Sequence, residues 1–344
     1  MGGKLFRALL NDSVRRLFDR ALGSLKAKTG RNLRIRIHID PNDARLRPLL
    51  GMPWELLYCA GTRGFLNLDR HTPVVRSLDA LQSTTAAPLS SPLRVLLVMA
   101  NPAGTSPLNL AEERAAVERT LRRIGSVELN VLERATCKGL RHRVREENFG
   151  IVHFMGHGAF DEPSAEGTLL LETSDGLIDP IPGEVLATIL KQGVGPALVV
   201  LNACKTAKSS AGEGATPFAG VAAALVGRGI PAVLAMRTSV RDSAAISLTE
   251  ELYERLAAGD PVEAALSEAR LALYSTSPSS PDWAIPVLFV RTAVISVHPE
   301  LQRETDSPPP PQEIVERGHS QQINNNAPIG TQNNIQGNVN QGRG

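Results

Sequence analysis

The feature that most constrains the fold is a regular alternation of short apolar runs and helical segments between residues 93 and 290. Short apolar runs bounded by Gly, Ala or Pro predict buried strands, and the segments between them have helical spacing. Such alternation predicts an α/β fold with a mostly parallel sheet and helices on both faces. We predict strands at 93–99, 127–132, 151–155, 198–202, 231–236 and 286–290, a surface hairpin at 168–172 and 176–179, and helices at 110–124, 138–147, 182–190, 217–226, 243–257 and 261–273.

The segment before this alternation predicts a small α+β layer. Its pattern indicates an amphipathic helix from residue 4 to about 27, a strand at 34–39 and short strands at 65–68 and 73–78. Pro53 suits the start of a short helix, in which Trp54 is predicted to be a core residue and Glu55 a buried, paired carboxylate. In the later helical region, Asp260 is the expected N-cap of the helix that follows it.

These patterns divide the chain into four parts. Residues 1–80 form the N-terminal layer, the Ser/Thr/Ala/Pro-rich residues 81–92 a linker, residues 93–296 the main α/β unit, and residues 297–344 a tail. The tail has a proline run at 308–311 and amide-rich stretches at 321–326 and 331–341, so it lacks the apolar surface to fold alone. It is either a solvated end or a recruitment peptide that pairs with another chain through its spaced aliphatic residues, Ile323, Ile329, Ile335 and Val339.

Composition and motifs exclude several classes of function. Apolar residues make up 42% and charged residues 21% of the chain, which is typical of a soluble globular protein. A formal net charge of +2 argues against nucleic acid or an anionic membrane as a partner. The three cysteines, Cys59, Cys137 and Cys204, show neither metal-ligand spacing nor a disulfide framework. We therefore expect a cytoplasmic protein without a metal or cofactor, a signal peptide or a membrane span.

Two of the predicted strands lead into reactive side chains. The run 151–155 is followed by Gly-His-Gly, with His157 in the middle, and the run 198–202 is followed by Ala-Cys, with Cys204 last. Ligands of an open parallel sheet bind outside the carboxyl ends of its strands, where both side chains are expected. An imidazole can take the proton of a thiol, and the thiolate can then attack a carbonyl. A cysteine at such a position is otherwise a small buried residue, but the two residues together predict a catalytic dyad.

The neighbouring residues suggest how such a site is completed. His153 lies inside the predicted strand, so it is expected to be a core histidine and His157 the base. Gly158 has no side chain, so its N–H and that of Cys204 can form an oxyanion hole. The small, polar segment 205–216, including Glu213, predicts a mobile loop beside the nucleophile. A third triad member is not evident, and the sequence lacks GxSxG, HExxH and GxxxxGK[ST] motifs.

These residues resemble the CHAT domain, a caspase-like cysteine peptidase group related to separase. The resemblance covers about residues 30–292 and includes His-Phe-Met-Gly-His-Gly at 153–158 and Leu-Asn-Ala-Cys at 201–204. Further matching blocks are 53–57, 75–77, 218–220, 240–242, 252–260, 268–270 and 282–283. It implies a caspase-hemoglobinase-like fold that includes the N-terminal layer, and endopeptidase activity with His157 as base and Cys204 as nucleophile. Caspases likewise carry their histidine about 50 residues before their cysteine.

The resemblance also suggests partners and a substrate pocket. CHAT proteins commonly work in bacterial conflict or cell-death systems, joined to sensor modules, so we expect a protein substrate and an activating protein that binds the tail. Asn202 precedes the cysteine by two positions, where related enzymes that cleave after basic residues often have an acidic residue. Arg237 would suit an acidic substrate side chain, and Asp161 or Asp242 a basic one; kinship with separase favours the basic preference. The alternative to a protease is a catalytically inactive scaffold that recruits partners through the tail.

Overall fold

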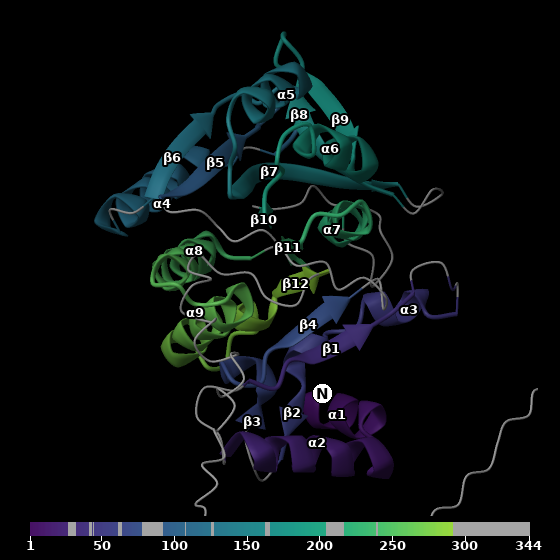
Figure 1. The fold of residues 1–344 in the computed structure, drawn as a ribbon. Coiled ribbons are helices and arrows are strands. Elements are labelled where there is room, and N and C mark those ends of the chain that lie inside the picture. Colours follow the sequence, from purple (N-terminus) through teal and green to yellow (C-terminus); the bar gives the residue numbers. More distant parts are fainter. Residues whose placement is uncertain are drawn as a thin grey trace, which may run out of the picture.

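The computed structural model describes residues 1–26, 32–40, 43, 45–60, 64–77, 92–106, 108–124, 127–161, 166–203, 217–238 and 240–291. Its main feature is one large sheet that runs through the whole molecule (Figure 1). The strand order is β1-β4-β12-β11-β10-β7-β5-β6, and the strands are Ile35–His38, Val74–Ser77, Pro286–Val290, Ala232–Met236, Leu198–Ala203, Ile151–Asp161, Leu93–Met99 and Val127–Leu132. Neighbouring strands on this path are parallel except β12, which is antiparallel to β11. The predicted α/β class with a mostly parallel sheet is confirmed.

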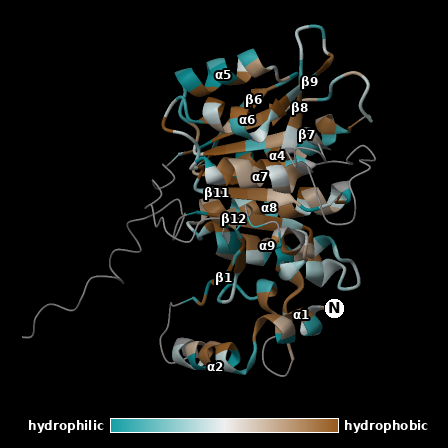
Figure 2. Ribbon diagram, turned by 90° about the vertical axis from the view of Figure 1, so that its right-hand side faces the viewer, coloured by the Kyte–Doolittle hydropathy of each residue, from teal (hydrophilic) through white to brown (hydrophobic). Residues whose placement is uncertain are grey.

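Helices cover both faces of the sheet, as predicted. One face packs against α4 (Leu110–Ile124), α8 (Asp242–Ala257) and α9 (Val262–Thr276), and the other against α5 (Cys137–Glu146), α6 (Gly183–Leu190) and α7 (Pro217–Gly227). Strand β10 shows why both faces are covered, because its apolar side chains point alternately to the two faces. Leu198 and Val200 join the core beneath α4, α8 and α9, and Val199 and Leu201 join the core beneath α5, α6 and α7. Figure 2 shows the resulting apolar strands between helices whose outer faces are more polar.

The N-terminal segment extends the same sheet rather than forming a layer apart from it. Strand β4 is parallel to β12, with Arg76 opposite Phe289, and β1 then pairs with β4. The remaining elements of this segment are α3 (Arg47–Leu50), η1 (Trp54–Leu56), β2 (Tyr58–Cys59), β3 (Gly64–Phe65) and η2 (Leu66–Leu68). In Figure 1, β2 and β3 lie below β1 with the two N-terminal helices, and α3 lies to the right of β1 and β4. The predicted strand at 65–68 was therefore wrong beyond Phe65, where the chain turns into the 3-10 helix η2.

The long N-terminal helix predicted from residue 4 to about 27 is two helices. Helix α1 spans Gly2–Leu9 and α2 spans Asp12–Lys26. The break lies at Asn11, whose side-chain Oδ1 accepts a hydrogen bond from the N–H of Val14 at 3.2 Å. An Asn that binds a backbone N–H three residues later starts a new helix, and this effect outweighs the continuous apolar spacing.

The predictions for Trp54 and Glu55 are confirmed. Trp54 is a core residue, and its indole N–H donates to the carbonyl oxygen of Leu49 at 2.9 Å. Glu55 is 1% exposed and receives hydrogen bonds from Nε and Nη2 of Arg76 at 2.9 to 3.1 Å.

Asp260 does not cap the helix that follows it. The N-cap of α9 is Pro261, with no side-chain hydrogen bond. The Asp260 carboxylate instead binds Arg70 at 2.6 Å and Nε of Arg255 at 2.6 Å. Two guanidinium groups hold the carboxylate more strongly than a single backbone N–H would.

The predicted hairpin after β7 is present but belongs to the sheet. Strand β8 (Glu166–Glu172) is antiparallel to the second half of β7 and to β9 (Ile178–Pro182). Its side chains Leu169 and Leu171 are buried in the core beneath α7.

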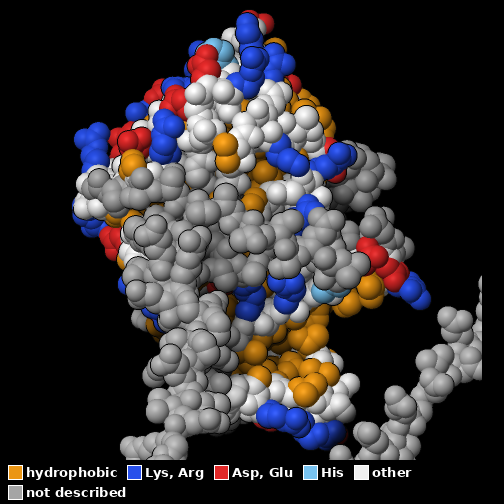
Figure 3. Space-filling model, in the orientation of Figure 1, with side chains coloured by type: hydrophobic (Ala, Val, Ile, Leu, Met, Phe, Trp, Pro, Cys, Tyr) orange, Lys and Arg blue, Asp and Glu red, His pale blue; other side chains and the backbone are white. Residues whose placement is uncertain are grey.

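Acidic and basic side chains are interspersed over the upper part of the face in Figure 3. No helix among the described residues is both long and apolar enough to cross a membrane.

Candidate active site

The two strands that lead to the predicted dyad are direct neighbours in the sheet. Strands β7 and β10 are parallel, and their register pairs Met155 with Asn202 and Gly156 with Ala203. The next residue on β7 is His157, and the next residue in the chain after Ala203 is Cys204. Cys204 and the loop 205–216, including Glu213, lie outside the described residues.

Strand β7 does not end before His157, contrary to the prediction. It continues to Asp161, because from His157 onward it pairs with β8, with His157 opposite Leu170. Gly156 directly precedes the part of β7 that pairs with β8. A Cβ at this position would lie 2.7 Å from the Phe154 ring and 2.8 Å from the carbonyl oxygen of Ala100. This glycine is therefore needed for close packing, whereas in the sequence it resembled a strand end.

The His157 ring is fully buried and held by one hydrogen bond. Its Nε2 lies 2.9 Å from the carbonyl oxygen of Ser106, in the connection between β5 and α4. A carbonyl oxygen only accepts hydrogen bonds, so Nε2 carries the hydrogen and Nδ1 keeps the lone pair. Nδ1 has no hydrogen-bond partner among the described residues. The ring is thus prepared to accept a proton at Nδ1.

Burial sets the charge of this ring. Desolvation lowers the pKa of His157 below its ordinary value, and the hydrogen bond to Ser106 opposes this shift. The imidazole is therefore neutral at pH 7, as a general base requires. When the ring takes up a proton, the Ser106 carbonyl stabilises the imidazolium because it accepts from a charged donor.

His153 is a core residue, as predicted. It is 1% exposed, and its Nδ1 lies 3.1 Å from the hydroxyl of Tyr253 on α8, with the two rings stacked. Desolvation lowers the pKa of His153 to about 4. Its Nε2 has no partner among the described residues, so only one of its nitrogens is hydrogen-bonded.

Of the other predicted site residues, Gly158 lies opposite Leu169 in the β7–β8 ladder. Asp161 is the last residue of β7, four residues beyond His157, which corresponds to about 13 Å along a strand. Asp242 is the first residue of α8. The side chains of Asp161 and Asp242 lie outside the described residues, so their role stays a prediction.

Asn202 lies beside Met155 and is 3% exposed. Its side chain borders a small cavity with Glu113 of α4 and Thr249 of α8. The Asn202 Oδ1 has no hydrogen-bond partner among the described residues. An unpaired buried acceptor is costly in free energy.

Arg237 directly follows β11, the strand on the other side of β10. Its N–H donates to the carbonyl oxygen of Ile285 at 3.0 Å, and its side chain lines a small pocket with Arg76. Burial lowers the pKa of Arg237, the carboxylate of Glu55 opposes this shift, and the charge of Arg76 adds to it. The Arg237 Nε is buried without a partner among the described residues.

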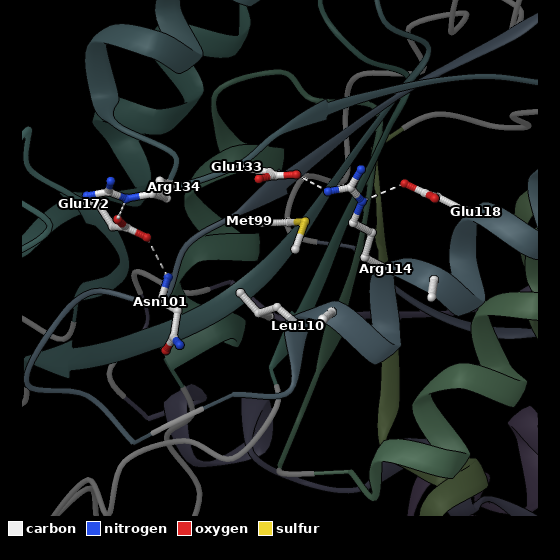
Figure 4. A pocket seen from close by; sticks show the side chains of 10 residues that line it. Met99, Asn101, Leu110, Arg114, Glu118, Glu133, Arg134 and Glu172 are labelled. Carbon is white, nitrogen blue, oxygen red and sulfur yellow. Dashed lines mark hydrogen bonds and ion pairs between the residues drawn. The ribbon is translucent and has the colours of Figure 1, made fainter.

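A larger open cavity of about 600 Å³ lies at the carboxyl ends of β5 and β6 (Figure 4). Met99 and Leu110 form its apolar floor, and charged side chains line it: Arg114, Glu118, Glu133, Arg134 and Glu172. Arg114 binds both Glu118 and Glu133. Within the described ranges, no group of three or more His, Cys, Asp or Glu side chains could hold a metal ion.

Sequence reasoning missed Ser106, whose main-chain carbonyl fixes the orientation of His157. Any residue type can supply a carbonyl oxygen, so no sequence signal could have identified it. It also missed that Arg237 shares a pocket with Arg76, the partner of the buried Glu55, because Arg76 and Arg237 are far apart in the chain.

Comparison with known proteins agrees with the resemblance in the sequence. The chain folds as an α/β protein with a mostly parallel sheet, and the sequence profile of the CHAT domain matches residues 4–297. The chain therefore belongs to the CHAT domain family. No curated protein sequence matches it.

Solved structures with a similar fold include two of Saccharomyces cerevisiae separase in complex with securin. The structure at 2.6 Å resolution has a TM-score of 0.42 and 17% identity, and the structure at 3.0 Å has a TM-score of 0.40 and 18% identity. Each match covers 72% of this chain and 15% of the separase chain. This chain thus spans only a small part of separase.

Proposed function

We propose that the protein is a cysteine endopeptidase in which His157 is the general base and Cys204 the nucleophile. The observation that carries the proposal is the pairing of Gly156 with Ala203 in parallel strands. Neighbouring strands lie about 4.8 Å apart, and successive Cα atoms about 3.8 Å apart. In this proposal, His157 and Cys204, the residues that follow this pair, start from adjacent strands at the same level of the sheet, and their side chains meet at hydrogen-bond distance.

The proposed reaction begins with proton transfer from the Cys204 thiol to Nδ1 of His157. The neutral ring and its Nε2–H bond to Ser106 support this direction of transfer. The thiolate attacks the peptide carbonyl, and the imidazolium then gives its proton to the departing amine. A water molecule, deprotonated by the same nitrogen, hydrolyses the thioester and restores the thiol.

The negative charge on the carbonyl oxygen needs hydrogen-bond donors during the attack. The proposed donors are the N–H groups of Gly158 and Cys204. Gly158 follows His157 directly and has no side chain to keep a substrate away from the main chain. Loss of one such donor typically lowers kcat by about 10² to 10³.

The residue before the cleaved bond is proposed to contact the side chains that surround the ends of β10 and β11. Arg237 supports an acidic residue there, because an arginine side chain stays protonated at neutral pH. Asp161 and Asp242 would support a basic residue, as kinship with separase implies. Asn202 is proposed to donate or accept a hydrogen bond on the same substrate in either case.

The proposed biological role is that of an effector protease in a bacterial defence or cell-death system, acting on a protein substrate in the cytoplasm. CHAT family membership and the recruitment-like composition of residues 297–344 support this role. In this proposal, a partner binds the tail and activates or localises the enzyme.

The test compares digests of a host proteome by the wild type, Cys204→Ala, His157→Ala and His153→Ala proteins. New peptide termini should appear with the wild type, and Cys204→Ala and His157→Ala should abolish them while both variants stay folded by circular dichroism. His153→Ala should retain cleavage and lose stability. Cleavage that survives Cys204→Ala, or a folded His153→Ala that is inactive beside an active His157→Ala, contradicts the assignment. A wild type that cleaves nothing but still binds partners would favour the scaffold alternative.

A further inference from the structure

The segment that holds His157 is itself held by a side chain outside the proposed dyad. Residues 100–106 connect β5 towards α4 and carry Ser106, the hydrogen-bond partner of His157. At the start of this segment, the N–H of Asn101 donates to Oε1 of Glu172 at 3.0 Å (Figure 4). Glu172 is the last residue of β8, the strand that pairs with β7 from His157 onward. Glu172 therefore links the strand beside His157 to the segment that orients its ring.

This carboxylate differs from the other contacts that fix the segment. Within the described part of the chain, and apart from the His157–Ser106 bond itself, the other hydrogen bonds that tie residues 100–106 to β7 and the hairpin join main-chain atoms. They are the bonds from Ala100 N–H to the Met155 carbonyl at 3.1 Å and from Ala103 N–H to the Gly176 carbonyl at 2.8 Å. Glu172 is thus the anchor that a substitution can remove without altering the main chain.

The Glu172 carboxylate is itself well fixed. The residue is 5% exposed, and its own N–H donates to the carbonyl oxygen of Ala135 at 2.8 Å. Its second oxygen, Oε2, receives a hydrogen bond from Nε of Arg134 at 3.3 Å. Arg134 is largely exposed and has a φ of 46°, in the left-handed region. The burial of Glu172 and its own main-chain hydrogen bond therefore fix the carboxylate, and the largely exposed Arg134 adds little to this.

We propose that Glu172 is a positioning residue for His157: it fixes residues 100–106 so that the Ser106 carbonyl keeps the hydrogen on Nε2 and leaves Nδ1 as the base. The catalytic part of this inference rests on the proposed function. The positional part concerns the ring itself and can be measured without any substrate.

The first test is the ring tautomer, read from long-range ¹H–¹⁵N NMR spectra of ¹⁵N-histidine-labelled full-length protein. The His157 signals are assigned by their loss in His157→Gln. Wild type should show a neutral ring with its hydrogen on Nε2, and Glu172→Gln should keep it because the amide oxygen still accepts from Asn101. Glu172→Ala should show a mixture of tautomers or exchange broadening. If Glu172→Ala unfolds, Glu172→Met removes the acceptor while filling a similar volume.

The second test is kinetic and uses a peptide substrate cleaved by the wild type. Glu172→Ala or Glu172→Met should lower kcat about tenfold or more with little change in KM, because a displaced base slows the chemical step. Glu172→Gln should recover most of this loss. The matched control is Arg134→Gly, which removes the partner of Oε2 and suits the left-handed backbone, and it should behave like the wild type.

The outcomes distinguish failure of the positioning role of Glu172 from failure of the proposed protease function. A single Nε2–H tautomer in Glu172→Met, or loss of that tautomer in Arg134→Gly, overturns the positioning role. So does a kcat for Glu172→Met within about twofold of the wild type in an active enzyme. A wild type that cleaves no substrate refutes the proposed function alone, because the NMR comparison still decides whether Glu172 positions His157.

Discussion

The guanidinium of Arg76 forms a buried ion pair with the carboxylate of Glu55, and the two side chains are 3% and 2% exposed. The pair joins η1 to β4, and Arg76 also donates to the carbonyl oxygen of Met52 at 2.9 Å. Within the N-terminal segment, it thus attaches η1 to the strand that extends the main sheet. Breaking a buried pair leaves one charge without its partner, which is costly in free energy.

We therefore expect Glu55→Gln to lower the free energy of unfolding by about 3 to 5 kcal/mol. Urea titration followed by circular dichroism measures the change. The exposed pair between Arg15 and Asp19 on α2 provides the control, and Asp19→Asn should change stability by less than about 1 kcal/mol. Similar small effects for both substitutions would show that the buried pair is not important for attaching η1 to β4.

A second prediction concerns pH and the buried His153. Its pKa falls from an ordinary 6.5 to about 4 in the folded protein. Between these pH values the unfolded chain binds a proton that the folded protein does not, so stability falls as pH decreases from about 6.5 to 4. A shift of this size corresponds to roughly 3 kcal/mol.

Denaturation at a series of pH values checks this loss. His153→Gln removes the titrating group, so its stability should depend less on pH over the same interval, although the variant is less stable at pH 7. His157 adds a dependence of the same sign, since its pKa is also lowered, and His157→Gln separates the two contributions. An unchanged slope in His153→Gln would show that other groups cause the acid sensitivity.

Much of the fold could be predicted because each element carries its own periodic signal. In β10, alternating apolar residues place Val199 on one face and Val200 on the other, and a strand with two buried faces reads as a continuous apolar run. Contacts between residues far apart in the sequence leave no such periodic signal. The continuation of β7 past Gly156 depends on packing against the Phe154 ring and on pairing with β8, and the sequence alone could not separate a close-packed glycine from a strand end.

The candidate site was predictable to a similar extent. His157 and its neighbour strand could be inferred from the order of apolar runs, because strand ends in a parallel sheet meet at one edge. The partner that fixes the ring could not, because Ser106 contributes only a main-chain oxygen. The environment of Arg237 also depended on long-range contacts, since the Glu55–Arg76 pair comes from the N-terminal segment.

A third prediction concerns substrate preference. Arg237 is positively charged, lies at the end of β11 and has no side-chain partner for Nε among the described residues. We expect substrates with Asp or Glu before the cleaved bond to be preferred, and Arg237→Ala to lower kcat/KM for them by about 10² or more. A fluorogenic peptide library sorted by that residue measures this.

The control is Arg228→Ala, which removes an exposed arginine that pairs with Glu184 on the distant helix α6. It should leave the preference unchanged. Preference for Arg or Lys substrates, lost in Asp161→Asn or Asp242→Asn, would instead support a pocket for basic side chains and refute the role of Arg237.

The last prediction concerns the tail, which lies outside the described residues. Residues 298–344 have no core-forming pattern, yet Ile323, Ile329, Ile335 and Val339 are spaced among amide side chains. A segment that orders only on binding loses conformational entropy at that step, which favours reversible recruitment. We expect a protein truncated after Val297 to keep its thermal midpoint and its basal cleavage of small peptides. Activation or delivery to the protein target in cells should be lost.

The isolated tail peptide provides the complementary experiment. It should lack stable structure by circular dichroism and should compete with the full-length protein for its partner. A second peptide, with Ile323, Ile329, Ile335 and Val339 replaced by Ser, keeps the amides and is the matched control; it should compete poorly, because the aliphatic side chains supply the apolar contact area on binding. Full cellular activity of the truncated enzyme would show that the tail is only a solvated end. Unfolding of the truncated enzyme would show that the tail packs against the body.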